Sequence, residues 1–425
     1  MTALLFITLF FLLFLGVPIG LCLGLAAIFA MLVTGETHLL PVIIQRMFTQ
    51  TDNFTLMAVP FFILAGNIMM KGGISKRLIE FIELLAKRLP ARLACITVIA
   101  SAFFGAISGS NPATVAAIGG LTTPRMIEKG YPRAEAGAVA ASAGTLGVVV
   151  PPSIPMVTYS VAASLSVGTM FLGGILPGII LAVVLCITNI VVNGKYDQPD
   201  KRHVSAGEFG KSFLNALLAL IMPIIILGGI YGGIFTPTEA AAVASVYALI
   251  IGAFVYRELT WKALYESFRD TVISSCVVLL VVALSAPFAW YMTFNNIPST
   301  IAMGVVTLFS NKISLLLAMN VILLFLGMFL ETQSIILLTT PIFLPMAVAV
   351  GLDPIALGII IVVNTSVGMI TPPMAVNLFV ASSISKSTIG QISKKIIPFL
   401  VVEFLTVLVF TYVPGIIMAL PNAFA

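Results

Sequence analysis

Polar side chains interrupt the apolar sequence in two pairs of segments. Each pair joins a short polar break to a glycine-containing stretch that ends in Pro-Pro, namely 108–111 with 144–152 and 331–334 with 364–373. Hydroxyl, amide and carboxylate oxygens bind hard cations such as Na⁺, and so do the backbone carbonyls that a broken helix leaves free. The pattern therefore indicates cation binding rather than bond-breaking chemistry.

Residues that other chemistries require are isolated or missing. Histidine occurs only at His38 and His203, both in polar loops, and the sequence has neither an H-E-x-x-H motif nor a G-x-x-x-x-G-K-[ST] loop. ATP is therefore not expected as the direct energy source. The 4 cysteines lie in apolar runs without paired spacing, as small hydrophobic residues do. An intramembrane hydrolase is disfavoured because no His or paired Asp lies at membrane depth.

The composition places these breaks inside a membrane. Of the 425 residues 60% are hydrophobic and 9% charged, and the mean hydropathy is +1.16. Soluble proteins carry roughly 25% charged residues, so a soluble enzyme is excluded. At about 20 apolar residues per crossing, the length allows roughly ten to fourteen membrane segments. The net charge of +5 then reports orientation and not a nucleic-acid partner.

Basic residues give the expected topology. All of the 21 Lys and Arg residues except Arg46 and Lys312 fall in five segments: 71–92, 125–133, 195–211, 257–269 and 386–395. The positive-inside rule puts these segments in the cytoplasm. The apolar stretch between Arg92 and Arg125 then begins and ends on one side, so we expect a re-entrant hairpin over 93–124. The alternative is a single span kinked at Pro112.

A second hairpin is expected over 313–350, between Lys312 and Asp353, entered from the outer face. Each hairpin precedes a broken helix, at 134–165 and 354–385. Gly105 precedes Gly147 by 42 residues and Gly327 precedes Gly368 by 41. The matched spacing and the opposite charge flanks predict an inverted repeat, with repeat one over about 2–193 and repeat two over about 237–420. The fold class expected is an all-α polytopic membrane protein, one unit over 1–425.

The remaining segments fit around this core. Ordinary spanning helices are expected over 2–33, 54–70, 168–193, 213–235, 240–256, 271–295 and 396–420. The first is too long for a cleaved signal peptide, and Pro18 could kink or split it. Residues 74–89 and 258–270 mix apolar and charged side chains, which favours amphipathic helices at the cytoplasmic interface with membrane lipid.

The polar breaks give explicit candidate sites. The first ion site comprises Ser108, Gly109, Ser110, Asn111, Gly144, Thr145 and Gly147. The second comprises Gly327, Glu331, Thr332, Gln333, Asn364, Thr365, Ser366 and Gly368. Candidate substrate-binding residues are Asn111, Pro152, Ser153, Thr371, Pro373 and Met374, where helix N-termini would offer positive dipole ends to an anion. The alternative is that the small residues merely allow close helix packing.

Three acidic positions have competing interpretations. Thr236-Pro237-Thr238-Glu239 has the pattern of a helix capping box. Glu331 inside an apolar hairpin indicates a cation, a proton or a buried pair, unless the tip is exposed to outer water. Glu403 could face a partner subunit or reach toward the membrane surface.

Several motifs are similar to one family. Segments 59–66, 104–120, 151–153, 228–242 and 371–373 resemble the large membrane subunit of tripartite ATP-independent periplasmic (TRAP) transporters, of the ion transporter superfamily. The resemblance covers essentially the whole chain. It implies an elevator-type secondary transporter in the bacterial inner membrane that is not an enzyme, with Na⁺ as coupling ion and no other cofactor.

The resemblance also implies partners and a substrate class. The partners are a small four-helix membrane subunit and a periplasmic substrate-binding protein, and the substrate is an organic acid, with sialic acid favoured over a C4-dicarboxylate. A self-sufficient sodium/dicarboxylate symporter or antiporter stays open as an alternative. Dependence of uptake on a binding protein separates the two.

Overall fold

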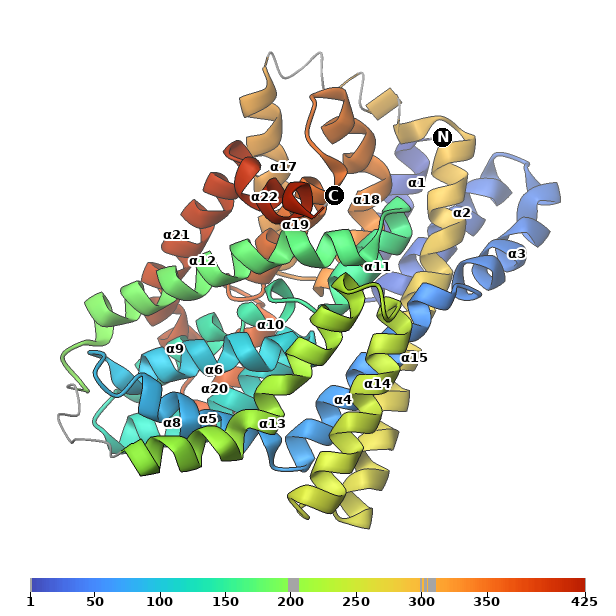
Figure 1. Ribbon diagram of the computed structural model, residues 1–425. Helices are drawn as coiled ribbons and strands as arrows, with labels where there is room; N and C mark the ends of the chain where they lie inside the picture. Colours follow the sequence, from blue (N-terminus) through green and yellow to red (C-terminus); the bar gives the residue numbers. More distant parts are fainter. Residues whose placement is uncertain (1, 198–205, 299, 302–303, 305–310, 425) are drawn as a thin grey trace.

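The computed structural model describes residues 2–424 except 198–205, 299, 302–303 and 305–310. His203 and part of the basic segment 195–211 lie outside these residues. Within them all regular secondary structure is helical, as expected (Figure 1). The first half contains α1 (Thr2–Phe14), α2 (Ile19–Val33), η1 (Thr37–Leu39), α3 (Leu40–Thr51), η2 (Phe54–Met57), α4 (Ala58–Lys71), α5 (Ile74–Leu85), α6 (Arg92–Ser108), α7 (Asn111–Thr114), η3 (Val115–Gly119), α8 (Gly120–Glu128), α9 (Arg133–Ala143), α10 (Leu146–Val149), α11 (Ile154–Ala163) and α12 (Val167–Asn193).

The second half contains α13 (Ala206–Tyr231), α14 (Pro237–Ile250), η4 (Ile251–Val255), α15 (Trp261–Phe294), α17 (Lys312–Gly327), α18 (Thr332–Ala349), α19 (Pro354–Gly368), α20 (Val376–Ser385), α21 (Ile389–Tyr412) and α22 (Gly415–Ala423). In the described residues, 7 helices are long and apolar enough to cross a membrane, or up to 8 if one bent pair counts as a span. The capping box at Thr236 is confirmed, because the Thr236 and Glu239 side chains each bond to the other residue's backbone N–H.

The first hairpin has the expected helix–break–helix form. Its first arm is α6, its break is Gly109-Ser110, and its second arm runs from α7 to α8 and packs back on α6. Both ends lie together, because Arg125 pairs with Glu83 of α5 and Arg92 also acts on that carboxylate. Burial raises the pKa of the Glu83 carboxyl, and the two arginine charges oppose that rise. The geometry is that of a hairpin and not of one kinked rod.

The second hairpin consists of α17 and α18, joined by residues 328–331. The two arms pack on each other, and Lys312 Nζ at the start of α17 donates to the Gly351 carbonyl just past α18 at 3.3 Å. In Figure 1 the open end of this hairpin is at the top of the view, whereas α8 lies at the lower left. The re-entrant placement of both hairpins in a membrane and the inverted repeat stay predictions.

Both Pro-Pro segments break their helices. The bent pair Arg133–Val149 and Ile154–Ala163 meets at 41° across Pro151-Pro152. The second break separates α19 from α20 at residues 369–375 and contains Pro372-Pro373. Proline has no N–H to donate and disfavours helical backbone at the residue before it, so two in succession end a helix.

A close glycine contact joins each hairpin to its broken helix. A Cβ placed on Gly105 would lie 2.9 Å from the Gly147 Cα, and one placed on Gly327 would lie 2.8 Å from the Gly368 Cα. These are the two glycine pairs whose sequence spacing matches. The backbones touch directly, so neither pair leaves room for a larger residue.

Five expected helices differ in their bounds. Segment 2–33 is two helices, α1 and α2, which pack on each other, because Gly16 has a left-handed φ of +79° and Pro18 follows it. Segments 258–270 and 271–295 form the single helix α15, since no glycine or proline separates them. The last span ends at Tyr412. Pro414 is then the N-cap of the short helix α22. The interfacial segment 74–89 is helical only over α5.

Two groups of helices meet at a shared interface. The support bundle, defined as α1–α4, α14 and α15, packs around α15 and α4. The hairpin bundle, defined as α6–α12 and α17–α22, contains both hairpins and both broken helices. Helices α5 and α13 connect them, because α13 packs on α14 and α5 packs on α6. The bundles touch where α4 meets α6 and where α15 meets α18.

Thiol labelling tests the membrane placement of the hairpins. In a background without native cysteines, we expect Arg92→Cys and Arg125→Cys to react from the cytoplasmic side with a membrane-impermeant reagent. Lys312→Cys and Asp353→Cys should react from the opposite side. Detergent-permeabilised membranes, in which all four should react, are the control. If the two members of either pair react from opposite sides, that segment crosses the membrane and is not re-entrant.

Candidate functional site

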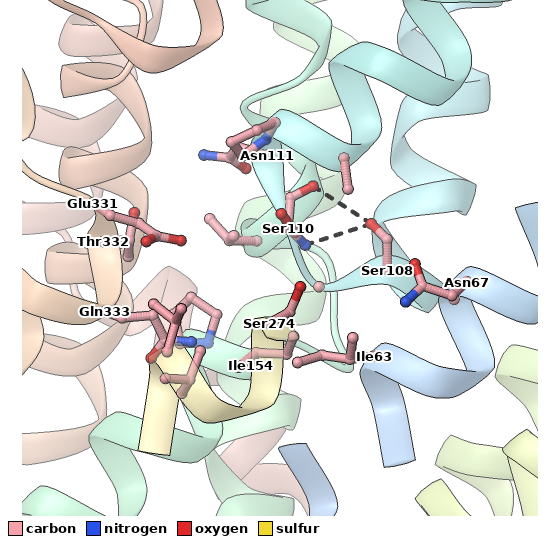
Figure 2. A pocket seen from close by; sticks show the side chains of 18 of the residues that line it. Ile63, Asn67, Ser108, Ser110, Asn111, Ile154, Ser274, Glu331, Thr332 and Gln333 are labelled. Carbon is pink, nitrogen blue, oxygen red and sulfur yellow. Dashed lines mark hydrogen bonds between the residues drawn. The ribbon is translucent and has the colours of Figure 1, made fainter. Parts of the chain in front are cut away.

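A cavity of about 290 Å³ lies where the two hairpin tips face the support bundle (Figure 2). Its walls come from both tips, from α4 and α15, and from the first turn of α11. Its polar lining residues are Asn67, Ser108, Ser110, Asn111, Ser274, Glu331, Thr332 and Gln333. Both polar breaks identified in the sequence therefore reach one cavity, although they are more than 200 positions apart.

The first tip is a tight turn built on Gly109. This residue has φ +57°, and a Cβ on it would lie 2.9 Å from the Ile154 backbone nitrogen. Both facts require glycine. The turn is held by Thr114, whose Oγ1 donates to the Ser110 carbonyl at 2.8 Å, and by the Ser108 hydroxyl, which lies 3.1 Å from Thr114 Oγ1. Hydroxyl and carbonyl oxygens thus gather at the tip.

Among the residues that the structure describes, the second tip contributes the only ionisable side chain that lines the cavity. Glu331 lies at the N-cap of α18, but its side chain makes no capping hydrogen bond and is exposed. Figure 2 shows Glu331 and Thr332 across the cavity from Ser110 and Asn111. No Lys or Arg of the described part of the chain lines the cavity. A carboxylate without a basic partner is suited to binding a cation.

Asn111 joins the two candidate ion sites. Its Nδ2 donates to the Ser366 Oγ at 2.6 Å, and that hydroxyl donates to the Thr145 carbonyl at 2.7 Å. All three residues are fully buried. The hairpin tip of the first half therefore contacts the broken helix of the second half and, through it, the broken helix of its own half.

Several buried oxygens at this junction have no hydrogen-bond donor among the described residues. They are Asn111 Oδ1, Ser153 Oγ, Gln333 Oε1 and Asn364 Oδ1. Burying an oxygen without a hydrogen-bond partner costs free energy unless a cation or a water molecule binds to it. Neutral oxygens of this kind fit Na⁺, so the donor set agrees with the ion that the sequence predicts.

Other candidate residues lie behind the cavity lining. Asn364 donates to Asn320 Oδ1 at 2.6 Å, and Gly144 and Gly147 pack against the second arm and the tip of the first hairpin. Thr365 is also buried.

Of the candidate substrate residues, Asn111 lines the cavity, and Pro152 and Ser153 directly precede its lining residues Ile154 and Pro155. Thr371, Pro373 and Met374 do not line it, and Pro373 and Met374 are exposed outside it.

The sequence interpretation missed the support-bundle wall. Asn67 of α4 and Ser274 of α15 line the cavity, with Asn67 beside Ser108 of the first tip in Figure 2, and Asn67 Nδ2 donates to Thr271 Oγ1 at 2.9 Å. The signal was present, since Asn67 is a single amide in a helix that is otherwise apolar up to Lys71 at its end. Asn320 was missed for the same reason.

The whole chain matches one family of membrane transporters. Residues 6–416 match the family described as tripartite ATP-independent periplasmic transporter, DctM component. The chain belongs to this family. The resemblance noted from the motifs is thus confirmed, and the protein is a membrane transporter permease.

Three relatives of this family member have different substrates in their names. The isethionate TRAP transporter permease of Oleidesulfovibrio alaskensis is 43% identical over 95% of this chain, which spans 64% of that relative's length. The C4-dicarboxylate large permease of Pseudomonas aeruginosa is 40% identical over 89% of this chain and 88% of its own length. The sialic acid large permease of Vibrio cholerae is 36% identical over 97% of this chain and 96% of its own length.

A solved transporter has a similar fold. The YdaH transporter of Alcanivorax borkumensis superposes with a TM-score of 0.64 over 90% of this chain and 89% of its own, at 14% sequence identity. At this identity the likeness shows the fold alone. It agrees with an all-helical transporter architecture.

Proposed function

We propose that this TRAP large permease uses a sodium gradient to carry an organic anion through the cavity between its hairpin tips. The observation that carries the proposal is the cavity lining itself, in which the described residues offer neutral oxygens and the Glu331 carboxylate but no Lys or Arg. An anion has no basic side chain to pair with there. It must be held by bound cations, by amides and hydroxyls, and by helix N-termini such as that of α11.

Two sodium ions fit the proposal better than one. Each half brings a polar tip and a glycine-rich break together, and each cluster contains a buried amide oxygen to which no described residue donates, on Asn111 and on Asn364. Na⁺ would be coordinated by these oxygens and would place positive charge behind the substrate. Substrate and sodium would then bind with mutual, reciprocal coupling.

The substrate class is a small organic acid. The relatives named for isethionate, a C4-dicarboxylate and sialic acid share an acidic group, a sulfonate or a carboxylate, and this shared chemistry is what the cavity must recognise. Sialic acid, which the overall family resemblance favoured, remains one candidate of three. A periplasmic binding protein would deliver the substrate, and a small membrane subunit would complete the complex, as the word tripartite in the family description implies.

The two-bundle architecture supports an elevator mechanism. The hairpin bundle holds every candidate ion-binding residue, whereas the support bundle contributes only one wall of the cavity, with Asn67 and Ser274. Movement of the hairpin bundle along α4 and α15 would carry ions and substrate together and would expose the cavity to each side in turn.

Reconstituted uptake tests the proposal. Proteoliposomes that contain the permease and its small subunit receive the cognate binding protein loaded with isethionate, a C4-dicarboxylate or sialic acid. We expect uptake of one acid to require Na⁺ and to fall at least tenfold when choline replaces Na⁺, even with a proton gradient present. Ser108→Ala should raise the sodium concentration that gives half-maximal uptake, because it removes one oxygen of the first site. Thr49→Ala on the exposed face of α3 is the control.

Two results would contradict parts of this scheme. Normal uptake in sodium-free buffer would refute the sodium coupling. Uptake that needs sodium but no binding protein would favour the self-sufficient symporter or antiporter instead.

A further inference from the structure

Three buried apolar side chains join the two bundles on one side of the cavity. Leu56 lies in η2, which leads directly into α4, Val282 lies in α15, and Leu337 lies in α18. Their exposed fractions are 1%, 1% and 5%. Val161 and Ala162 of α11 pack against them. The Leu56 cluster, defined as Leu56, Val282 and Leu337, therefore combines residues of the support bundle with one of the hairpin bundle.

The Leu56 cluster lies directly next to the cavity. Val278 lines the cavity and also packs against the cluster, and Val282 follows it one helical turn further along α15. On α18 the cavity-lining residue Gln333 is followed one turn later by Leu337. Both helices thus run from the cavity into the same cluster.

The cluster lies on the side of the cavity away from the basic ends of α4 and α15. Helix α4 ends at Lys71, at the start of the basic segment 71–92, and α15 begins within the basic segment 257–269. Leu56 precedes α4, and Val282 is in the second half of α15. With the basic segments in the cytoplasm, as the positive-inside rule predicts, the cluster is on the outer side of the cavity.

The support wall on the cytoplasmic side of the cavity is polar instead. One helical turn from the lining residue Asn67, Lys71 Nζ pairs with Asp270 Oδ2 at 3.0 Å and with Glu266 Oε2 at 3.3 Å. Asp270 in turn precedes the lining residue Ser274 by one turn of α15. All three charged side chains are partly exposed, so water reaches this wall, whereas the buried Leu56 cluster excludes water on the other side.

We propose that the Leu56 cluster is the outer seal of the cavity, which forms when the cavity faces the cytoplasm and separates when it faces outward. The inference rests on the proposed elevator movement and deepens it. Leu337 moves with the hairpin bundle while Leu56 and Val282 stay with the support bundle, so their contact breaks in each cycle. An apolar contact suits this role because it is non-directional and can form again, and because ions do not cross a dry apolar constriction.

Labelling of a cysteine in the cavity tests the seal without transport. In a background without native cysteines, Ser274→Cys places a thiol on the cavity lining, and a membrane-impermeant thiol reagent is applied to one side of the membrane. We expect this thiol to react at least tenfold faster from the cytoplasmic side than from the outer side. Adding Leu337→Ala should raise the outer-side rate at least tenfold, because it removes the hairpin-bundle part of the seal. Leu323→Ala, at a buried leucine of α17 outside the Leu56 cluster, is the matched control and should leave the rate unchanged.

A crosslink tests whether the seal must open during uptake. Val282→Cys with Leu337→Cys joins the two bundles through Hg²⁺, and we expect uptake to fall at least tenfold and to recover when excess thiol removes the metal. Gly24→Cys with Leu284→Cys is the control, since a Cβ on Gly24 would lie 3.7 Å from the Leu284 Cβ and both residues belong to the support bundle. Crosslinking that pair should leave uptake unchanged, because no movement separates its members.

The outcomes separate the seal from the proposed function. Equal labelling of Ser274→Cys from both sides refutes the seal, whether or not uptake requires sodium. Failure of Val282→Cys and Leu337→Cys to crosslink, or full uptake after they crosslink, overturns it as well. Should Leu337→Ala not fold, Val282→Ala replaces it, and an unchanged outer-side rate in that variant contradicts the seal. Sodium-independent uptake contradicts the proposed coupling alone, since the labelling rates are measured without transport.

Discussion

Replacing Gly368 with alanine should lower the melting temperature of the purified permease and abolish uptake. The added Cβ would lie 2.5 Å from the Gly327 Cα and 2.8 Å from the Gly327 carbonyl carbon. Both are backbone atoms, so no flexible side chain can move aside. Overpacking of this kind costs about 1 to 3 kcal/mol, or more where the backbone must shift. The shift would separate the second hairpin from its broken helix and displace the oxygens near Asn364.

A second glycine variant provides the control. Gly228 lies in α13, and a Cβ on it would meet nothing within 4 Å. Gly228→Ala should keep uptake and leave the melting temperature equal or higher, because alanine favours a helix by about 1 kcal/mol over glycine. Equal melting temperatures for Gly368→Ala and the wild type would mean that the two backbones do not touch in the membrane.

Replacing Glu331 with glutamine should cut uptake at least tenfold in a protein that still folds. Glu331 is the only ionisable residue lining the cavity, and it faces Ser110 and Asn111 across it. An anionic substrate would be repelled by this carboxylate unless a cation lies between them. Removing the charge should therefore weaken binding of the cation more than binding of the substrate in the absence of the cation. It should also reduce the coupling free energy between cation and substrate.

The coupling is measured directly by titration. Substrate affinity is determined across a range of Na⁺ at constant ionic strength, with choline as the replacement ion. Coupling free energies of this type are about 1 to 3 kcal/mol, and we expect most of that dependence to disappear in Glu331→Gln. Glu128→Gln, an exposed carboxylate at the end of α8, should behave like the wild type. A sodium dependence that survives unchanged in Glu331→Gln would show that other ligands hold the ion.

Much of the site follows from local sequence features. The breaks at 108–111 and 331–334 combine small and polar residues in apolar surroundings, and each Pro-Pro pair prevents a continuous helix through steric and hydrogen-bonding effects confined to a few residues. Such effects can be predicted without knowing the neighbours. The same reasoning failed for segment 258–270, where charge suggested a separate interfacial helix. Helix α15 continues through it because no glycine or proline interrupts the segment, and its Glu266 and Asp270 side chains pair with Lys71 of α4.

The sequence by itself determined the membrane-transporter class, the two hairpins and the two broken helices, because hydropathy, charge flanks and proline act locally. Only the tertiary structure decided which breaks meet. Asn111 reaches Ser366 across 255 positions, and Asn67 and Ser274 come to one cavity from helices far apart in the chain. It also decided that Glu403 of α21 is fully buried, so this residue neither faces a partner subunit nor reaches toward the membrane surface, as the sequence had suggested. The rotation of a helix about its axis depends on the partners that pack around it, and a nearly uniform apolar sequence contains little information on that rotation.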